Sequence, residues 1–445
     1  MYRKGTYLTY NNNVIQDGPC KKILCLYTDK RYDYIVRLSS AYLCDQNNVI
    51  SLRHELLQHY GTGRFDLLKS AEMCSRYVKE VGIDSVLALE DVAAPILSSL
   101  VEKYGSFAFR GPSFESVFLT INKYYTRKLL DPNPVPYCHI DLNSHLESAT
   151  LENMLNEVGL PAILKPACGT GSVLIQKINS FDDLVHAIES SKKHYSSIIG
   201  SHAALSSKFL DLSRYPLALT DGLMILEKYV DGEIIELDGY VFNGKAYRWA
   251  LYDLTTWPTH PNVNQMLFLP STKPTHIQER IWDMFETVAN RAADYGYDNH
   301  FMNMQLFLCK NGDVRLLEIN GRMTTVCSPL CQKSLTSGDT IEAQLRLAQG
   351  EKPPPAKLTG VHSAYVSIRS TISGKANEII DFQVAESMEN VNLHTGPDEY
   401  IQPVGDGGKS VGGAYLFADS REEIWQKHRD LYKRLFKKHP IGCSN

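Results

Sequence analysis

The chain has 445 residues, which at ~150 residues per domain corresponds to about three domains and excludes a single small core. Hydrophobic residues make up 43% and charged residues 22%, which is the mixture of a globular protein and not of a disordered chain. The net charge of −4 gives no general reason to expect nucleic acid or an anionic membrane as a partner.

The amino terminus and the cysteines favour a cytoplasmic protein. The first residues lack the apolar segment of a secretory signal, and no window of ~18 apolar residues predicts a transmembrane helix. The ten cysteines are scattered without a CxxC pair, which is typical of reduced thiols. Cys327 and Cys331 could form half of a metal site, but we expect ordinary thiols because no second pair or nearby histidine completes it.

The first hundred residues alternate between strand and helix patterns. Buried-strand runs at 23–26 and 85–89, with a weaker one at 49–52, flank an amphipathic helical pattern between Leu67 and Val81. This order predicts a parallel sheet in a Rossmann-like lobe. The first strand is followed by Tyr-Thr-Asp instead of a glycine-rich turn, so a classical nicotinamide site is not expected there.

The middle of the chain has an α+β pattern. We expect strands at 163–165 and 173–175 around a flexible loop, a helix capped by Ser180 with Asp183, and a mobile Ser-rich loop at 196–215. Further strands are expected at 224–229, 236–242, 304–308 and 314–319, with a long helix at 277–295. Asn243-Gly244 and Asn311-Gly312 each predict a two-residue hairpin turn.

The last part of the chain follows a linker at the prolines 353–355. It contains mixed strands and a final helix, which Ser420 and Glu423 cap and which turns Ile424, Leu431 and Leu435 inward. We therefore expect an antiparallel α+β region between two smaller lobes.

The first segment that could carry chemistry is PAILKPACGTGSVLI, residues 161–175. Gly169 and Gly171 can bring backbone N–H groups close to an anion, and Lys165 precedes them on a strand. A Walker loop has its lysine after the glycines, so this segment predicts a β-hairpin lid over phosphates and not a P-loop. A glycine-containing hairpin with a solvated lysine is the alternative.

The second segment runs from Glu227 to Val230 and turns at Asp231-Gly232. Exposed backbone beside Tyr229 and Val230 could meet the edge of an adenine ring, and Glu233 could hold ribose hydroxyls. A strand edge with surface charges is an equally good explanation of this segment by itself.

The third segment is the hairpin at 303–323. Strict alternation puts Val314, Leu316 and Glu318 on one side of its second strand, and Asn320 can share that side. Together with Gln305 from the paired strand, these side chains supply the oxygen ligands that Mg²⁺ prefers. An ion pair between Glu318 and Arg322 is the alternative explanation, since a buried charge needs a partner.

These segments, in this order, resemble the ATP-grasp superfamily over about residues 110–330. The residues that carry the resemblance are Lys123 in INKYYTRKLL, Lys165, the glycine loop, Glu-Lys-Tyr-Val and Glu-Ile-Asn-Gly-Arg. The resemblance implies an α/β and α+β protein with the ATP-grasp fold. Its parts would be an N-terminal Rossmann-like parallel-sheet lobe at 1–122, two α+β subdomains at 123–215 and 216–352 that clamp ATP, and a small C-terminal lobe at 353–445.

The resemblance also implies a role for each of these residues. Lys123, Lys165 and the loop residues Gly169, Thr170, Gly171 and Ser172 would meet the phosphates of ATP. Glu227, Lys228, Tyr229 and Val230 would meet the adenine, and Glu233 the ribose. Gln305, Glu318 and Asn320 would hold magnesium, and Arg322 would hold the substrate carboxylate or acyl phosphate.

Two departures from the family pattern stand out. The first metal ligand, usually an acid, is Gln305 here, and Met323-Thr324-Thr325-Val326 stands where paired glycines often follow the arginine. The first removes a negative charge from the metal site, and the second predicts a reshaped acceptor end of the pocket.

The function implied is that of an ATP-dependent carboxylate–amine ligase, similar to the amino-acid and dipeptide ligases of the carnosine-synthase group. It would use ATP and Mg²⁺, with Mn²⁺ as an alternative ion, and would take a small carboxylate and an amine. No nucleic-acid or membrane partner is expected, and a homodimer is left open. The alternatives are a nucleotide-binding regulatory protein without catalysis, which Gln305 favours, and an ATP-grasp enzyme with a different acceptor.

Overall fold

The computed structural model describes residues 22–28, 32, 36, 49–52, 56, 66–169, 174–198, 202–257, 260–403 and 408–437, and the structural statements below concern these residues. Among them, no helix is both long and apolar enough to cross a membrane. The loop residues Thr170, Gly171 and Ser172 lie outside the described part of the chain.

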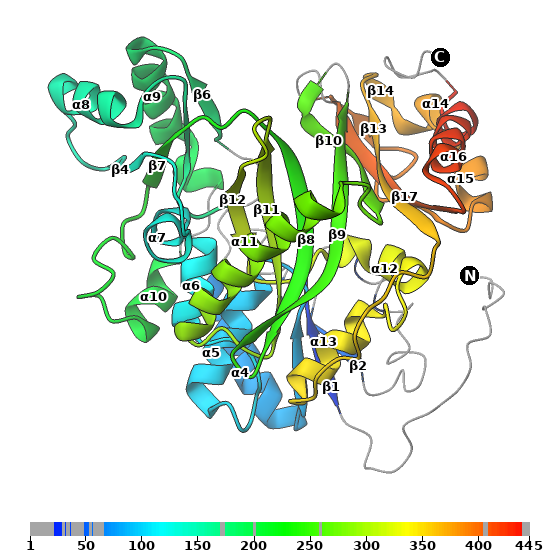
Figure 1. Ribbon diagram of the computed structural model, residues 1–445, viewed down its shortest axis with the longest axis horizontal. Coiled ribbons are helices and arrows are strands. Elements are labelled where there is room, and N and C mark those ends of the chain that lie inside the picture. The colour runs from blue at the N-terminus through cyan, green and yellow to red at the C-terminus, as the bar shows by residue number, and fades with distance from the viewer. Residues whose placement is uncertain are drawn as a thin grey trace.

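The N-terminal lobe contains the predicted parallel sheet (Figure 1). The strand order is β2-β1-β3, with β1 at Ile23–Leu26, β2 at Val49–Ser51 and β3 at Ser85–Ala88. Its helices are α4 (Leu67–Val81), α5 (Ala93–Tyr104) and α6 (Phe114–Ile121). Asp66 caps α4 by accepting from the N–H of Lys69 at 2.9 Å, and the helix buries the apolar stripe that predicted it.

A second, antiparallel sheet lies at the upper left of Figure 1. Its strand order is β4-β7-β5-β6, with β4 at Tyr137–Asp141, β5 at Ala162–Pro166, β6 at Gln176–Ile178 and β7 at Leu223–Lys228. The helices α8 (Ser148–Val158) and α9 (Phe181–Ile198) pack on it through one apolar core. Between the N-terminal lobe and β4 lie the short helix α7 (Lys123–Tyr125) and a π-helical turn, η1 (Thr126–Leu130).

The largest sheet among the described strands has eight members in the order β12-β11-β8-β9-β10-β13-β17-β15. The first five strands come from the middle of the chain: β8 (Gly232–Phe242), β9 (Lys245–Trp257), β10 (His260–Leu269), β11 (His300–Cys309) and β12 (Val314–Asn320). The last three are β13 (His362–Ser370), β17 (Lys409–Ala418) and β15 (Val391–Leu393). The sheet therefore continues across the predicted boundary at 352/353.

The two faces of this sheet have different neighbours. One face packs on α11 (Thr275–Asp294), whose Phe285 lies against Gly239, where a Cβ would come within 2.1 Å of the ring. On the other face, Tyr240 and Phe301 share a core with Leu87 of the N-terminal lobe. This second face also contacts the region of η2 (Thr325–Cys327), α12 (Ser328–Ser334) and α13 (Thr340–Ala348).

The C-terminal region adds short elements and one long helix. They are β14 (Gly374–Lys375), α14 (Ala376–Ile379), α15 (Phe382–Ser387), β16 (Tyr400–Ile401) and α16 (Arg421–Leu435). The N–H of Glu423 donates to the hydroxyl of Ser420 at 3.2 Å, and Ile424, Leu431 and Leu435 are buried, as predicted. At the start of α9 the N–H of Asp183 donates to Ser180 at 3.1 Å, which confirms that cap as well.

Four local predictions were wrong. The stretch predicted as a mobile loop at 196–215 contains the end of α9 and the helix α10 (Ala203–Phe209). Of the strand predicted at 173–175, residues 174 and 175 precede β6, which begins at Gln176, and residue 173 lies outside the described residues. The hairpin between β11 and β12 is longer than two residues, because Cys309 donates its N–H to the carbonyl of Asp313 at 2.8 Å. The turn at Asn243-Gly244, with φ of 50° and 70°, has the predicted two-residue form.

The fourth error concerns the face on which Glu318 lies. Leu306 pairs with Leu316, but the next residue back, Gln305, pairs with Glu318, so Leu317 is an extra residue in β12. This β-bulge reverses the alternation, because one inserted residue shifts every following side chain to the other face. Glu318 therefore lies on the opposite face from Val314 and Leu316, beside Gln305, and Asn320 shares its side as predicted.

Candidate functional site

Lys123 lies where three segments meet. It begins α7, and its backbone N–H donates to the carbonyl of Ala167 at 2.7 Å. Its Nζ donates to the carbonyl of Gly169 at 3.0 Å and lies 3.7 Å from Oε2 of Glu318. The lysine, the start of the glycine loop and the carboxylate of β12 are therefore neighbours.

Lys165 belongs to a buried network of charges. Its Nζ lies 2.5 Å from Oε1 of Glu227, and both side chains are almost fully buried. Nε of Arg127 donates to Oε2 of the same carboxylate at 3.1 Å. Burial lowers the pKa of Lys165, against the pull of Glu227. Burial would raise the pKa of Glu227, but the charges of Arg127 and Lys165 outweigh it and hold that pKa below its ordinary value.

Arg127 connects three elements of the site. Besides Glu227 at the end of β7, it reaches Asp131 with an Nη1–Oδ2 distance of 3.5 Å and donates from Nη2 to the carbonyl of Leu317 at 2.8 Å. Leu317 is the bulged residue of β12, so Arg127 satisfies a carbonyl at the point where the ladder is irregular. Sequence reasoning missed this residue, although it follows Lys123 by one helical turn.

The segment predicted to meet the nucleobase is partly engaged with the protein itself. The N–H of Lys228 donates to the carbonyl of Pro136 at 2.9 Å, and that of Tyr229 to Pro161 at 3.0 Å. The ammonium of Lys177 lies 4.3 Å from the centre of the Tyr229 ring. Val230 follows Tyr229 at the turn into β8.

Glu233 is not brought together with the other predicted site residues. Both of its carboxylate oxygens accept from Nζ of Lys273 at 2.7 Å, and 45% of its side chain is exposed. It pairs with Leu308, which packs on the α11 side of the sheet, so alternation puts it on the opposite face from Glu236 and Gln305.

The predicted metal ligands form two adjoining rows across three strands. Glu236 of β8, Gln305 of β11 and Glu318 of β12 are register partners in one row. Asp238, Asn303 and Asn320 are the corresponding residues of the next row. The predicted ligands Gln305, Glu318 and Asn320 therefore offer one carboxylate and two amides.

Two buried carboxylates of β8 complete these rows. Glu236 accepts hydrogen bonds from Asn303 at 3.2 Å, from Thr324 at 2.9 Å and from Gln305 at 3.4 Å. Asp238 accepts from the N–H of Thr324 at 2.8 Å and from the hydroxyl of Tyr252 at 2.9 Å, which fixes the turn after Arg322. Burial and the nearby Asp238 raise the pKa of Glu236 to about 7. Sequence reasoning missed both residues.

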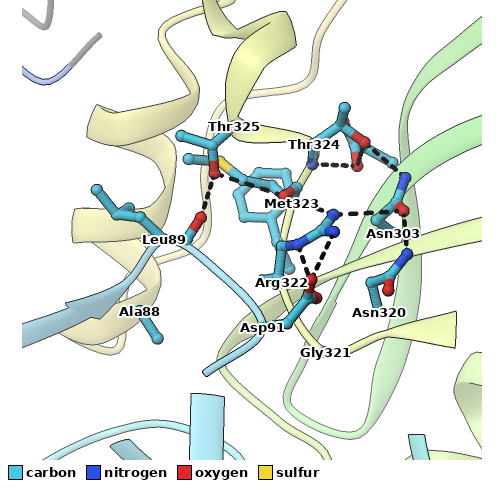
Figure 2. Close-up of polar contacts among 12 residues, drawn as sticks. Ala88, Leu89, Asp91, Asn303, Asn320, Gly321, Arg322, Met323, Thr324 and Thr325 are labelled. Carbon is cyan, nitrogen blue, oxygen red and sulfur yellow. Dashed lines mark hydrogen bonds and ion pairs between the residues drawn. The ribbon is translucent and has the colours of Figure 1, made fainter. Parts of the chain in front are cut away.

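Arg322 is held by the N-terminal lobe and not by Glu318. Its Nε lies 2.9 Å from Oδ1 of Asp91 and its Nη2 donates to Oδ2 at 3.1 Å, which is a bidentate pair (Figure 2). Nη1 points toward Asn303, 3.5 Å from its Oδ1. The Glu318–Arg322 ion pair, the alternative considered from the sequence, is therefore absent from the described contacts, and Lys123 is the cation beside Glu318.

The structure thus collects Lys123, Gly169, Gln305, Glu318 and Asn320 around one corner of the large sheet, with Lys165 and Glu227 in an adjoining buried pair. Cys327 and Cys331 are buried thiols under the same face, and burial raises the pKa of each. They belong to a cluster of mostly apolar and aromatic side chains, and Sγ of Cys331 lies 3.2 Å from the hydroxyl of Tyr252.

Comparison with known proteins identifies the domain that contains these residues. Residues 158–330 match the ATP-grasp domain family. The chain is 23% identical over 259 residues to a pyruvate carboxylase subunit from Methanothermobacter thermautotrophicus, which covers 58% of this chain and 47% of that protein. It is 29% identical over 140 residues to D-alanine–D-alanine ligase of Mycobacterium ulcerans, covering 29% and 37%. The chain therefore spans less than half of the length of these two relatives.

Several solved structures resemble almost the whole chain, and one of them illustrates the likeness. It is the L-amino acid ligase from Bacillus licheniformis, with a TM-score of 0.69, 15% identity, and coverage of 93% of this chain and 98% of that one. An identity this low shows a shared fold. With the match of residues 158–330 to the domain family, it shows that the chain contains an ATP-grasp domain and has the ATP-grasp fold.

Proposed function

We propose that the protein is an ATP-dependent ligase that joins a small carboxylate, most simply an amino acid, to an amine. The single observation that carries the proposal is the convergence at Lys123, whose Nζ is 3.0 Å from the Gly169 carbonyl and 3.7 Å from Glu318. A phosphate-binding lysine, a glycine loop and a metal-binding carboxylate are the groups that a phosphoryl transfer requires.

In the proposed reaction a carboxylate oxygen of the substrate attacks the γ-phosphorus of ATP and ADP leaves. The amine nitrogen then attacks the acyl carbon, inorganic phosphate leaves with its bonding electron pair, and the nitrogen loses a proton. No protein nucleophile is needed, so the residues of the chain act by positioning and by neutralising charge.

The residues have distinct tasks in this proposal. Lys123 and Lys165 neutralise phosphate oxygens. Arg322 holds the substrate carboxylate through its guanidinium group, which already binds the carboxylate of Asp91 through Nε and Nη2. Glu227 keeps Lys165 charged and in place within the buried pair. The backbone N–H groups of Lys228 and Tyr229 already donate to carbonyls of the protein. We therefore assign the adenine to the backbone at Val230, in the turn that follows them.

The side chains at the end of β12 fit a magnesium ion. Glu318 offers a carboxylate that is 30% exposed, and Gln305 and Asn320 are its neighbours on the same face of the sheet. A bound Mg²⁺ would neutralise the phosphates of ATP during the transfer. Glu318, Gln305 and Asn320 are the residues that we assign to hold it.

The test is a screen of acids and amines with ATP, read by ADP release and by mass spectrometry of the product. We expect ADP release that requires both an acid and an amine, with a product mass equal to the sum of the two minus water. The second candidate is a nucleotide-binding protein without catalysis, which the neutral Gln305 favours. It predicts nucleotide binding without ADP release for every pair.

A further inference from the structure

The amide side chains that we assign to the metal site share one feature. The NH₂ groups of Gln305 and Asn303 both donate to the carboxylate of Glu236, and the NH₂ group of Asn320 donates to the side-chain oxygen of Asn303. An amide can bind a cation only through its oxygen, so the direction in which each amide points decides whether it is a ligand at all.

The orientation of Asn303 is determined by its neighbours. Its Nδ2 lies 3.0 Å from the carbonyl oxygen of Leu237 and 3.2 Å from Oε1 of Glu236. A backbone carbonyl can only accept, so the NH₂ of Asn303 must face β8 and its oxygen must face β12. That oxygen in turn accepts from Nδ2 of Asn320 at 2.8 Å (Figure 2).

Asn320 is therefore oriented indirectly. With its NH₂ group donating to Asn303, its own carbonyl oxygen is the end left for another partner. The relay runs from Asn320 through Asn303 to Glu236, across all three strands.

Gln305 is oriented by Glu236 directly. Its Nε2 donates to Oε2 of Glu236 at 3.4 Å, and its register partner on the other side is Glu318. The amide nitrogen of Gln305 thus faces β8, and its amide oxygen faces Glu318 on β12.

We propose that Glu236 is the positioning residue of the metal site. It receives the NH₂ group of Gln305 directly, and it shares the NH₂ group of Asn303 with the hydroxyl of Thr324 and the carbonyl of Leu237, so that the amide oxygens of Gln305 and Asn320 face a divalent cation at Glu318. The inference rests on the proposed function, since it concerns the ion that accompanies ATP. It also accounts for the amide at position 305, because the NH₂ group of Gln305 is held by a carboxyl group one strand away, on β8.

The experiment replaces Glu236 by the shape-matched Glu236→Gln and measures binding of Mn²⁺ with ADP by electron paramagnetic resonance of the free ion. The new NH₂ group cannot accept a hydrogen bond from Gln305, so that amide turns and presents nitrogen to the ion. We expect Mn²⁺ affinity to fall about 10–100-fold, as for other residues that orient metal ligands. Binding of ADP without metal should change less than threefold.

Asp253→Asn is the control. Asp253 lies on the neighbouring strand β9 and is 2% exposed, and it contacts Ser271, Thr272 and Arg421 but none of the residues bonded to Glu236. Mn²⁺ affinity of this variant should stay within threefold of the wild type. Equal Mn²⁺ affinity in Glu236→Gln and wild type, or an equal loss in both variants, would overturn the proposal.

A crystal structure of the wild-type protein with Mn²⁺ and ADP tests the same point if Glu236→Gln does not fold. We expect the ion to contact Glu318 and the oxygens of Gln305 and Asn320, with Glu236 bound only to the amide NH₂ groups. Direct coordination by Glu236, or an ion away from both amides, would overturn the proposal. Failure of the proposed ligase function would be seen separately, as Mn²⁺–ADP binding without turnover in the acid and amine screen.

Discussion

At the scale of single residues, the charges of this site are held in pairs. Each cation that we assign to a phosphate or a substrate has a protein carboxylate beside it: Glu227 for Lys165, Glu318 for Lys123 and Asp91 for Arg322. A buried charge without a partner would be costly, so these pairs keep the cations ionised and in place. The Lys165–Glu227 pair is almost fully buried, whereas Glu318 is partly exposed. We therefore expect the first pair to contribute more to stability and Glu318 to contribute more to ligand binding.

Glu318→Gln tests the least buried of these carboxylates. Its contact with Lys123 is long, at 3.7 Å, and 30% of its side chain is exposed, so the variant should melt within a few degrees of the wild type. If Glu318 binds magnesium, turnover should fall about 10²-fold or more, because the transferring phosphoryl loses charge compensation. Nucleotide binding should also lose its dependence on magnesium, measured by calorimetry with and without the ion. A variant that binds MgADP as the wild type does would contradict the assignment.

At the scale of elements, Arg127 joins η1, β7 and β12 through Glu227, Asp131 and the bulged carbonyl of Leu317. The same bulge sends Glu318 to the site face of the sheet. The position of the metal carboxylate therefore depends on an irregular point of β12 that a side chain from another element supports.

Arg127→Ala should destabilise the protein more than Lys165→Ala. Removal of Arg127 leaves Glu227 with Lys165 alone and takes donors from Asp131 and Leu317, for which we expect a loss of about 3–5 kcal/mol. Removal of Lys165 leaves Glu227 paired with Arg127, so a loss of about 1–3 kcal/mol is expected. The free energy of unfolding in urea measures both. A larger loss of unfolding free energy in Lys165→Ala than in Arg127→Ala would contradict this prediction.

The sequence predicts most elements because hydrophobic periodicity reports which faces are buried. Helices α4 and α16 both carry an apolar stripe and a cap; the sequence predicts the range 67–81 for α4, and for α16 it predicts the cap at Ser420 and the buried face. The bulge at Leu317 was not predicted, since an extra leucine in LLEIN looks the same as a regular strand. The helix α10 was missed because its seven residues are too few to show a helical period, although Ala203, Ala204 and Leu205 favour a helix and Leu205 is buried in the core.

At the scale of the whole molecule, the site combines parts that are far apart in the chain. Asp91 follows β3 of the N-terminal lobe and pairs with Arg322 beyond β12, while Thr325 donates to the carbonyl of Leu89 at 2.6 Å (Figure 2). The sequence contained Asp91 and Arg322 but no sign of their pairing, because local patterns do not report long-range contacts. The order of the site segments along the chain predicts the ATP-grasp fold, but it does not predict which residues contact one another across the lobes.

The stability of the whole molecule should fall in acid, partly through His428 of α16. Burial, with a smaller effect of Arg429, lowers the pKa of His428 to about 4. The unfolded chain binds a proton at its ordinary pKa of about 6.5, so this contribution is complete above that pH and is lost as pH falls toward 4. We expect His428→Phe to reduce the slope of unfolding free energy by about 1.4 kcal/mol per pH unit in that range. Equal slopes in His428→Phe and in the wild type would contradict the assignment.

We propose that ATP activates a carboxylate as an acyl phosphate before the amine attacks. The most direct measurement uses a carboxylate substrate with ¹⁸O in both oxygens and follows the label by mass spectrometry of the released phosphate. We expect one ¹⁸O in each inorganic phosphate formed with product, and none in ADP. Product formation with unlabelled phosphate would contradict this mechanism.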